Sequence, residues 1–101
     1  MVKKMSNDVL GLEYIETGGE VTIRMTGRLD SETAPRFQAE AVPRCAGRPV
    51  VLDMTDLKYI SSAGLRAIIV LRKTGSPVRV ENASGLVEEV LRISDFETLL
   101  R

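Results

Sequence analysis

Two adjacent serines, Ser61 and Ser62, are the side chains of this sequence best suited to carry chemistry. They precede an apolar segment, residues 65–74, that predicts a buried helix, so their hydroxyls would stand near its N-terminus. A serine in that position usually accepts a hydrogen bond from a backbone N–H and caps the helix. The alternative is a hydroxyl that forms part of a docking surface for another protein.

Helix geometry extends this candidate site along one stripe of the surface. If Ser62 opens the helix, the residues four, seven and eleven positions later share its face, and these are Arg66, Ile69 and Lys73. An aliphatic centre within a charged rim is typical of a docking surface for another protein. A solvated face with Ile69 turned aside fits the same spacing, and the sequence leaves both interpretations open.

Other reactive side chains are assigned structural roles. Asp53 and Asp56 are two carboxylates without a further ligand, so turn and cap positions explain them better than a metal site or an acid–base pair. Asp30 is expected to brace its loop through hydrogen bonds to the backbone, with contact to a partner as the alternative. Cys45 has no neighbouring base and is expected to be a small buried hydrophobe.

Composition argues against most enzyme classes. The chain has 101 residues, of which 44% are hydrophobic, enough for one domain with one core over residues 1–101. It contains no His, one Cys and no glycine-rich phosphate loop, which removes histidine-based triads, the usual zinc sites and nucleotide hydrolysis. We therefore expect a binding protein, not an enzyme, with no metal or other cofactor.

Charge and hydropathy limit the partners and the compartment. Fourteen Lys and Arg balance fourteen Asp and Glu, so no overall field attracts nucleic acid or an anionic membrane. The apolar run at residues 67–71 is far shorter than the roughly 20 residues of a membrane-spanning helix. With no signal-peptide pattern and a single cysteine, the chain is expected in a reducing cytoplasm.

The strands that must position the site are predicted from hydrophobic patterning. Four are expected, at residues 12–16, 20–26, 49–53 and 77–81. The Gly18–Gly19 pair suits a tight hairpin between the first two. The third is a continuous apolar run, which predicts a central strand covered on both faces, and residues 53–60 are expected to form the loop that leads to the serines.

Three helices follow these strands in the order β-β-α-β-α-β-α, which indicates an α/β fold with a mixed sheet. The first begins within residues 31–35, and Pro43 predicts an end or a kink near Val42. The second stops at residues 75–77. The third is capped by Ser84. Apolar side chains predict the buried faces: Ala34, Phe37, Ala41 and Cys45 in the first helix, and Leu86, Val87, Val90, Leu91 and Ile93 in the third.

Three separated segments resemble the STAS domain of bacterial anti-sigma factor antagonists. They are residues 26–30, residues 51–65 around the serine pair, and residues 84–96. The resemblance spans nearly the whole chain and implies a STAS-like mixed β-sheet of four to five strands with helices packed mainly on one face. It also implies a protein that binds an anti-sigma factor, often itself a serine kinase, and so releases a sigma factor.

The resemblance implies that the kinase phosphorylates Ser62 and thereby switches binding off. Ser61 is the second choice, because it stands where phosphorylated members often have Asp. A phosphatase for the modified serine and a monomer or weak homodimer are also expected. Together with the stripe on the helix, the resemblance predicts a partner-binding surface made of Asp30, Ser61, Ser62, Ala63, Gly64, Arg66, Ile69 and Lys73.

A second interpretation stays open beside this one. STAS domains also serve as non-phosphorylated scaffold subunits of larger assemblies, such as a signalling or a lipid-transport complex. In that role the serine pair would do no more than begin the helix.

Overall fold

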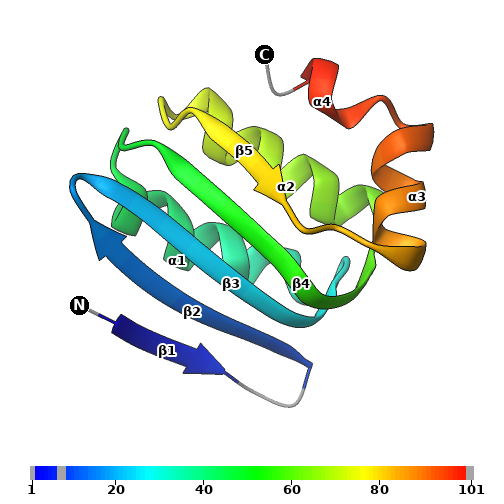
Figure 1. Ribbon diagram of the computed structural model, residues 1–101, viewed down its shortest axis with the longest axis horizontal. Coiled ribbons are helices and arrows are strands. Elements are labelled where there is room, and N and C mark those ends of the chain that lie inside the picture. Colours follow the sequence, from blue (N-terminus) through cyan, green and yellow to red (C-terminus); the bar gives the residue numbers. More distant parts are fainter. Residues whose placement is uncertain (1, 7–8, 100–101) are drawn as a thin grey trace.

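The computed structural model describes residues 2–6 and 9–99, which fold into one five-stranded sheet covered by helices (Figure 1). Along the chain, the elements are β1 (Val2–Ser6), β2 (Leu10–Thr17), β3 (Glu20–Leu29), α1 (Ala34–Cys45), β4 (Val50–Ile60), α2 (Ser62–Lys73), β5 (Val78–Glu81), α3 (Gly85–Ile93) and α4 (Phe96–Leu99). The predicted order of elements is confirmed. The structure adds β1 and α4, which the sequence patterns did not predict.

The sheet is mixed, as expected, and its strands lie in chain order. β1, β2 and β3 pair antiparallel, whereas β3, β4 and β5 pair parallel. Gly18 and Gly19 turn the β2–β3 hairpin with φ angles of 58° and 84°. Both positive values match the type I′ turn that the pair predicts, because this turn follows the natural twist of the flanking strands.

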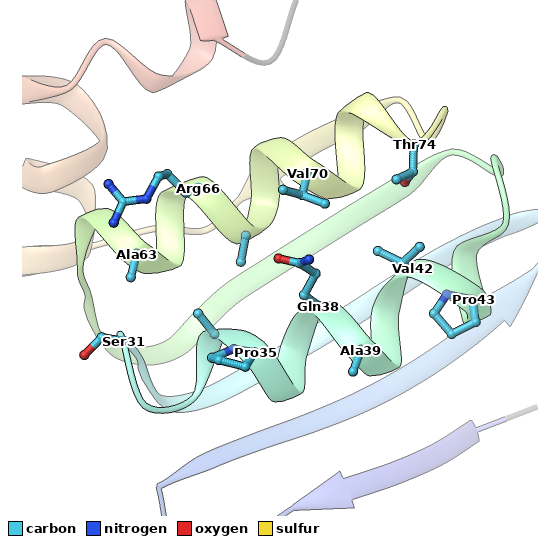
Figure 2. Close-up of a pocket in the computed structure, with 12 residues that line it drawn as sticks. Ser31, Pro35, Gln38, Ala39, Val42, Pro43, Ala63, Arg66, Val70 and Thr74 are labelled. Atoms are coloured by element: carbon cyan, nitrogen blue, oxygen red, sulfur yellow. The ribbon is translucent and has the colours of Figure 1, made fainter.

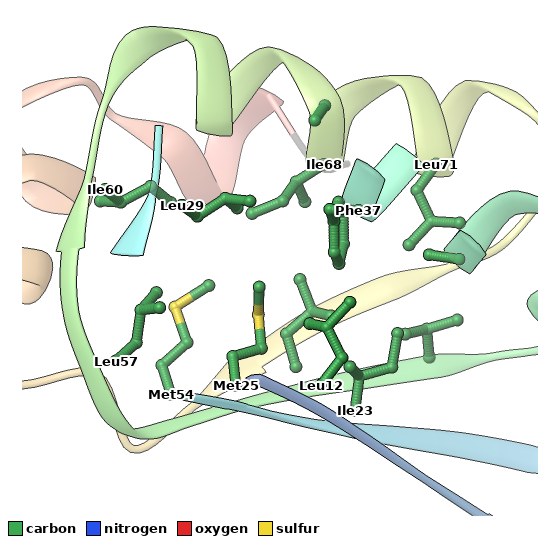
Figure 3. Packing of buried hydrophobic residues seen from close by; sticks show 14 of the residues in the cluster. Leu12, Ile23, Met25, Leu29, Phe37, Met54, Leu57, Ile60, Ile68 and Leu71 are labelled. Atoms are coloured by element: carbon green, nitrogen blue, oxygen red, sulfur yellow. The ribbon is translucent and has the colours of Figure 1, made fainter. Parts of the chain in front are cut away.

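The hydrophobic core lies between the sheet and the helices α1 and α2, which run behind the strands in Figure 1. Figure 3 shows Phe37 of α1 and Ile68 and Leu71 of α2 facing the strand residues Met25 and Met54. These side chains are buried, as are the four predicted core residues of the first helix, Ala34, Phe37, Ala41 and Cys45. Burial of this face holds α1 and α2 in place, and so positions the start of α2.

The opposite face of the sheet carries no helix. Arg24 lies there between two carboxylates, with its guanidinium 3.4 Å from Glu13 and 3.6 Å from Asp53. Ion pairs between such exposed side chains add little stability, so this face is a solvated surface. Val51 also points to it and is nevertheless only 3% exposed.

The expectation that this strand is central is confirmed, because β4 is an interior strand between β3 and β5. Two other expectations about β4 are wrong. Helices cover one face of the sheet instead of both. Residues 53–60, expected as a loop, continue the strand as far as Ile60. They pair with β3 through two register shifts, between Arg24 and Thr26 and between Gly27 and Arg28. The irregular burial that these shifts produce explains why the residues do not show strand alternation.

The first helix passes through its proline instead of ending near Val42. Pro43 lies inside α1, which continues to Cys45 and ends at Ala46 in the left-handed conformation. Proline removes one backbone donor, but Ala39, whose carbonyl loses its partner, is exposed and open to water. The helical bonding resumes at once, because the N–H of Ala46 donates to the carbonyl of Val42 at 3.1 Å.

The third helix buries less of its apolar face than its pattern predicts. Of its apolar side chains only Val87 is fully buried, while Leu86 is 52% and Ile93 75% exposed. Val90 and Leu91 are half-buried against the core. In the described part of the chain, no helix has the length and apolar character needed to cross a membrane.

Cys45 is buried with no exposed surface, as expected of a small core residue. Burial raises the pKa of its thiol to about 11, outweighing the nearby Arg48. Because the thiolate is the reactive form, we expect no reaction with a disulfide reagent in the native protein at pH 8, and full reaction after denaturation. Rapid stoichiometric labelling of the folded protein would contradict this, with Cys45→Ser as the blank.

Candidate functional site

The two serines at the start of α2 have different surroundings. Ser61 is the N-cap residue, half-buried, and its Oγ accepts a hydrogen bond from the N–H of Gly64 at 3.4 Å. Ser62 is the first residue of the helix and is exposed, and its hydroxyl has no hydrogen-bond partner within the described residues. The capping role thus belongs to Ser61, so the hydroxyl of Ser62 faces solvent without a structural task.

The N-terminal turn of α2 is anchored on the end of β3. The N–H of Ser61 donates to the carbonyl of Leu29 at 3.0 Å. Gly64 packs so closely on the same carbonyl that a Cβ at this position would lie 2.6 Å from its oxygen. Gly64 is therefore buried and fixes the helix start, whereas the sequence had placed it on the partner-binding surface.

The loop that follows Leu29 is held rigid by Asp30, as expected. The Asp30 carboxylate accepts hydrogen bonds from the N–H groups of Glu32 at 3.0 Å and Thr33 at 3.2 Å. The Thr33 hydroxyl in turn donates to the carbonyl of Arg28 and accepts from the N–H of Asp30, both at 2.9 Å. Asp30 thus lies beside the start of α2, one residue from the carbonyl that anchors Ser61.

These contacts set the ionisation of Asp30. Desolvation opposes its charged form, but the backbone N–H groups of Glu32 and Thr33 and the guanidinium of Arg28, 3.8 Å away, outweigh it and lower the pKa of the carboxyl. A lowered pKa in the folded state adds stability above the ordinary value of 3.8, and this stability is lost as the pH falls through the lowered pKa.

We therefore expect the parent protein to be more stable than its Asp30→Asn variant at pH 7, with the difference shrinking below pH 3.8. Urea unfolding of both proteins from pH 7 to pH 2.5 measures the difference. A gap that is the same at both ends of this range would show that the charge of Asp30 contributes nothing to the fold.

A groove of about 710 Å³ runs between α1 and α2, and Ala63 and Arg66 line it near the start of α2 (Figure 2). Arg66 is the one ionisable residue that lines it, and in Figure 2 its guanidinium extends along α2 toward the N-terminal turn. The other lining residues are small, apolar or uncharged: Ser31, Ala34, Pro35, Gln38, Ala39, Val42, Pro43, Ala63, Ala67, Val70 and Thr74. This groove is a concave surface that borders the first turns of α2, the helix that Ser62 begins.

The structure rearranges the predicted stripe on α2. Ser62, Arg66 and Lys73 are exposed, but Ile69 is half-buried and packs against the core. Lys73 is the last residue of α2, roughly 16 Å along the helix from Ser62 at 1.5 Å per residue. The surface at the serines is therefore formed by Ser62, Arg66 and the groove beside them, without Lys73.

Sequence reasoning missed the groove residues. Ala63 was among the predicted contacts, but Ala67 and Val70 were assigned only to a buried helix, and Pro35, Ala39 and Val42 lie outside the predicted buried face of α1. The available clue was the apolar character of α2 around most of its circumference. Which of its sides the sheet would leave open depends on how α1 packs beside it.

Asp53 and Asp56 have different surroundings. Asp53 accepts hydrogen bonds from the hydroxyl and N–H of Thr55, at 2.6 and 3.1 Å, and from the side chain of Asn82 at 3.3 Å. Asp56 is exposed. Among residues 2–6 and 9–99, no cluster of three or more potential ligands could hold a metal ion.

One family model matches most of this chain, and several solved structures share its fold. Residues 12–101 match the family model described as "Mlab, STAS domain". One similar solved structure is the anti-sigma factor antagonist SpoIIAA in its unphosphorylated form, with 18% identity, a TM-score of 0.73 and coverage of 87% of this chain and 84% of that one. A second is an anti-sigma factor antagonist from Mycobacterium paratuberculosis, with 16% identity, a TM-score of 0.73 and coverage of 92% of this chain and 84% of that one. A third is phosphorylated SpoIIAA of Bacillus, with 18% identity, a TM-score of 0.64 and coverage of 87% of this chain and 86% of that one. No curated protein sequence matches the chain.

Proposed function

Because the chain belongs to the STAS domain family, we propose that it is an anti-sigma factor antagonist whose binding is switched off by phosphorylation of Ser62. In its unmodified form it binds an anti-sigma factor through the surface around Ser62 and Arg66, and so releases a sigma factor. The similar folds in these three antagonist structures, two of them of SpoIIAA, support this assignment.

The observation that carries the proposal is that Ser61 caps α2 while Ser62 is exposed. Since Ser61 caps α2, a kinase can reach the exposed Ser62 without breaking a contact that holds the helix. The first turn of α2 contains no acidic residue, and Arg66 follows one turn later. A phosphate on Ser62 would thus lie at a helix N-terminus whose dipole favours negative charge.

The modification is a transfer of the γ-phosphoryl group of ATP. The Oγ of Ser62 forms a bond to the γ-phosphorus as the bond to the bridging oxygen of ADP breaks, and the hydroxyl proton passes to a base of the kinase. The product carries a charge of about −1.5 to −2 and three acceptor oxygens. The fold tolerates this group because it lies in solvent, whereas a partner that covers the surface must desolvate it.

The test is a pull-down with the tagged chain from a lysate of its own source, followed by incubation of the purified complex with Mg-ATP. We expect an anti-sigma factor to be recovered, one phosphoryl group to appear in the mass spectrum, and peptide mapping to place it on Ser62. Ser62→Ala is expected to block the modification and Ser61→Ala to leave it in place. Modification of the Ser62→Ala variant at Ser61 would contradict the assignment.

A second candidate is a scaffold subunit that is never phosphorylated. The observation that favours it is the matching family model, which is described as Mlab and not as an anti-sigma factor antagonist. In this case the chain would copurify with a stable complex, such as a signalling or lipid-transport assembly, and ATP would cause no mass change on either serine. The same pull-down therefore separates the two candidates.

A further inference from the structure

The groove between α1 and α2 combines an apolar floor with one unpaired charge. Pro35, Ala39, Val42, Ala63 and Val70 line it. Arg66 is exposed, and no carboxylate in the described part of the chain pairs with it. A surface of this composition complements a protein segment with apolar side chains and one acidic side chain.

Arg66 is also placed to reach a phosphate on Ser62. Residues four apart on a helix are neighbours on its surface, and the guanidinium of Arg66 extends toward the N-terminal turn (Figure 2). Guanidinium and phosphate groups form strong, paired hydrogen bonds. One guanidinium cannot pair fully with a phosphate of its own chain and with a carboxylate of a partner at the same time.

We propose that the partner places an apolar segment in the groove and pairs one of its carboxylates with Arg66, and that a phosphoryl group on Ser62 takes over the same guanidinium. This inference rests on the proposed function and adds the physical step by which the switch works. Phosphorylation removes the partner's only cationic contact in the groove and brings a like charge toward its carboxylate.

A double-mutant cycle tests the competition for Arg66, with isothermal titration against the purified anti-sigma factor as readout. Arg66→Gln is expected to weaken binding of the unmodified protein about tenfold. The loss caused by Ser62→Asp should then fall from more than a hundredfold in the parent to about tenfold in the Arg66→Gln background. Lys73→Gln, which removes one charge from the far end of α2, should change neither value.

A steric variant tests the groove itself. Ala39 is exposed and lines the groove from α1, so Ala39→Trp fills the groove without touching the core. We expect this variant to melt like the parent and to bind at least about tenfold more weakly. Thr26→Trp, on the open face of the sheet, should bind normally. Unchanged binding by Ala39→Trp would overturn the proposal. So would a change in the oligomeric state of the isolated chain caused by this substitution, because it would show that a second copy of the chain occupies the groove.

A measurement on the isolated chain tests the phosphate contact without any partner. Phosphorus NMR of the protein phosphorylated on Ser62 reports the second ionisation of the phosphate, which has a pKa of about 6 in a free peptide. With Arg66 present this pKa should be lower by roughly half a pH unit than in the phosphorylated Arg66→Gln variant. Equal values in the two proteins would remove the contact on which the competition depends.

These experiments distinguish a failure of this inference from a failure of the proposed function on which it rests. If Ser62→Asp binds the anti-sigma factor as the parent does, the phosphorylation switch itself is wrong. If Ser62→Asp loses the same hundredfold with and without Arg66, the switch stands and the competition for Arg66 is wrong.

Discussion

Ser62→Asp is expected to bind the anti-sigma factor at least a hundredfold more weakly than the parent protein, while melting at the same temperature or slightly higher. The fold is unaffected because the hydroxyl is exposed and a negative charge is favourable at a helix N-terminus. The complex is affected because covering the added charge and losing the contact of Arg66 with the partner together cost about 3 kcal/mol or more, which corresponds to over a hundredfold in affinity. Titration calorimetry and thermal melting measure the two quantities independently.

Two matched variants show whether position or charge is responsible. Ser62→Ala removes the hydroxyl without adding charge and should bind within a few fold of the parent, because the hydroxyl has no structural partner in the described residues. Thr26→Asp adds the same charge on the open face of the sheet and should also bind normally. Equal binding by Ser62→Asp and Ser62→Ala, or unfolding of the Asp variant, would contradict the proposed switch.

Gly27→Ala is expected to lower the free energy of unfolding by about 3 kcal/mol or more, the largest change in stability that we foresee for a single added methyl group. Gly27 has a φ angle of +86°, and a Cβ there would lie 2.1 Å from the carbonyl oxygen of Val9. This oxygen accepts the N–H of Arg28 at 2.8 Å, so it cannot move aside without breaking a hydrogen bond.

The β2–β3 hairpin provides a control residue, Gly19, with nearly the same φ angle as Gly27. Gly19 has a φ angle of +84°, but a Cβ there would meet no atom within 4 Å. Gly19→Ala therefore measures the strain of a positive φ alone, expected to cost about 1 kcal/mol. Urea denaturation of both variants gives the difference, and similar losses of stability would show that the close approach of Val9 is unimportant.

Much of the fold was predictable because its determinants are local. The hairpin depends on two glycines, and the ends of α2 depend on a capping serine and on the residues at positions 74–77. The boundaries that were predicted wrongly are those that distant contacts decide. β4 extends to Ile60 because β3 supplies a partner strand. α1 continues through Pro43, and the residue whose carbonyl loses its partner, Ala39, is exposed.

By itself, the sequence determined the class of the fold, the serine pair at the start of a helix and the positive charge one turn later, because these depend on residue type and spacing. Only the tertiary structure decided that Ser61 caps the helix and leaves Ser62 exposed, that Ile69 packs inward, and that Arg66 borders a groove. The reason is physical. Spacing along a helix shows which side chains share a face, but the elements that pack beside the helix decide which face remains open to a partner.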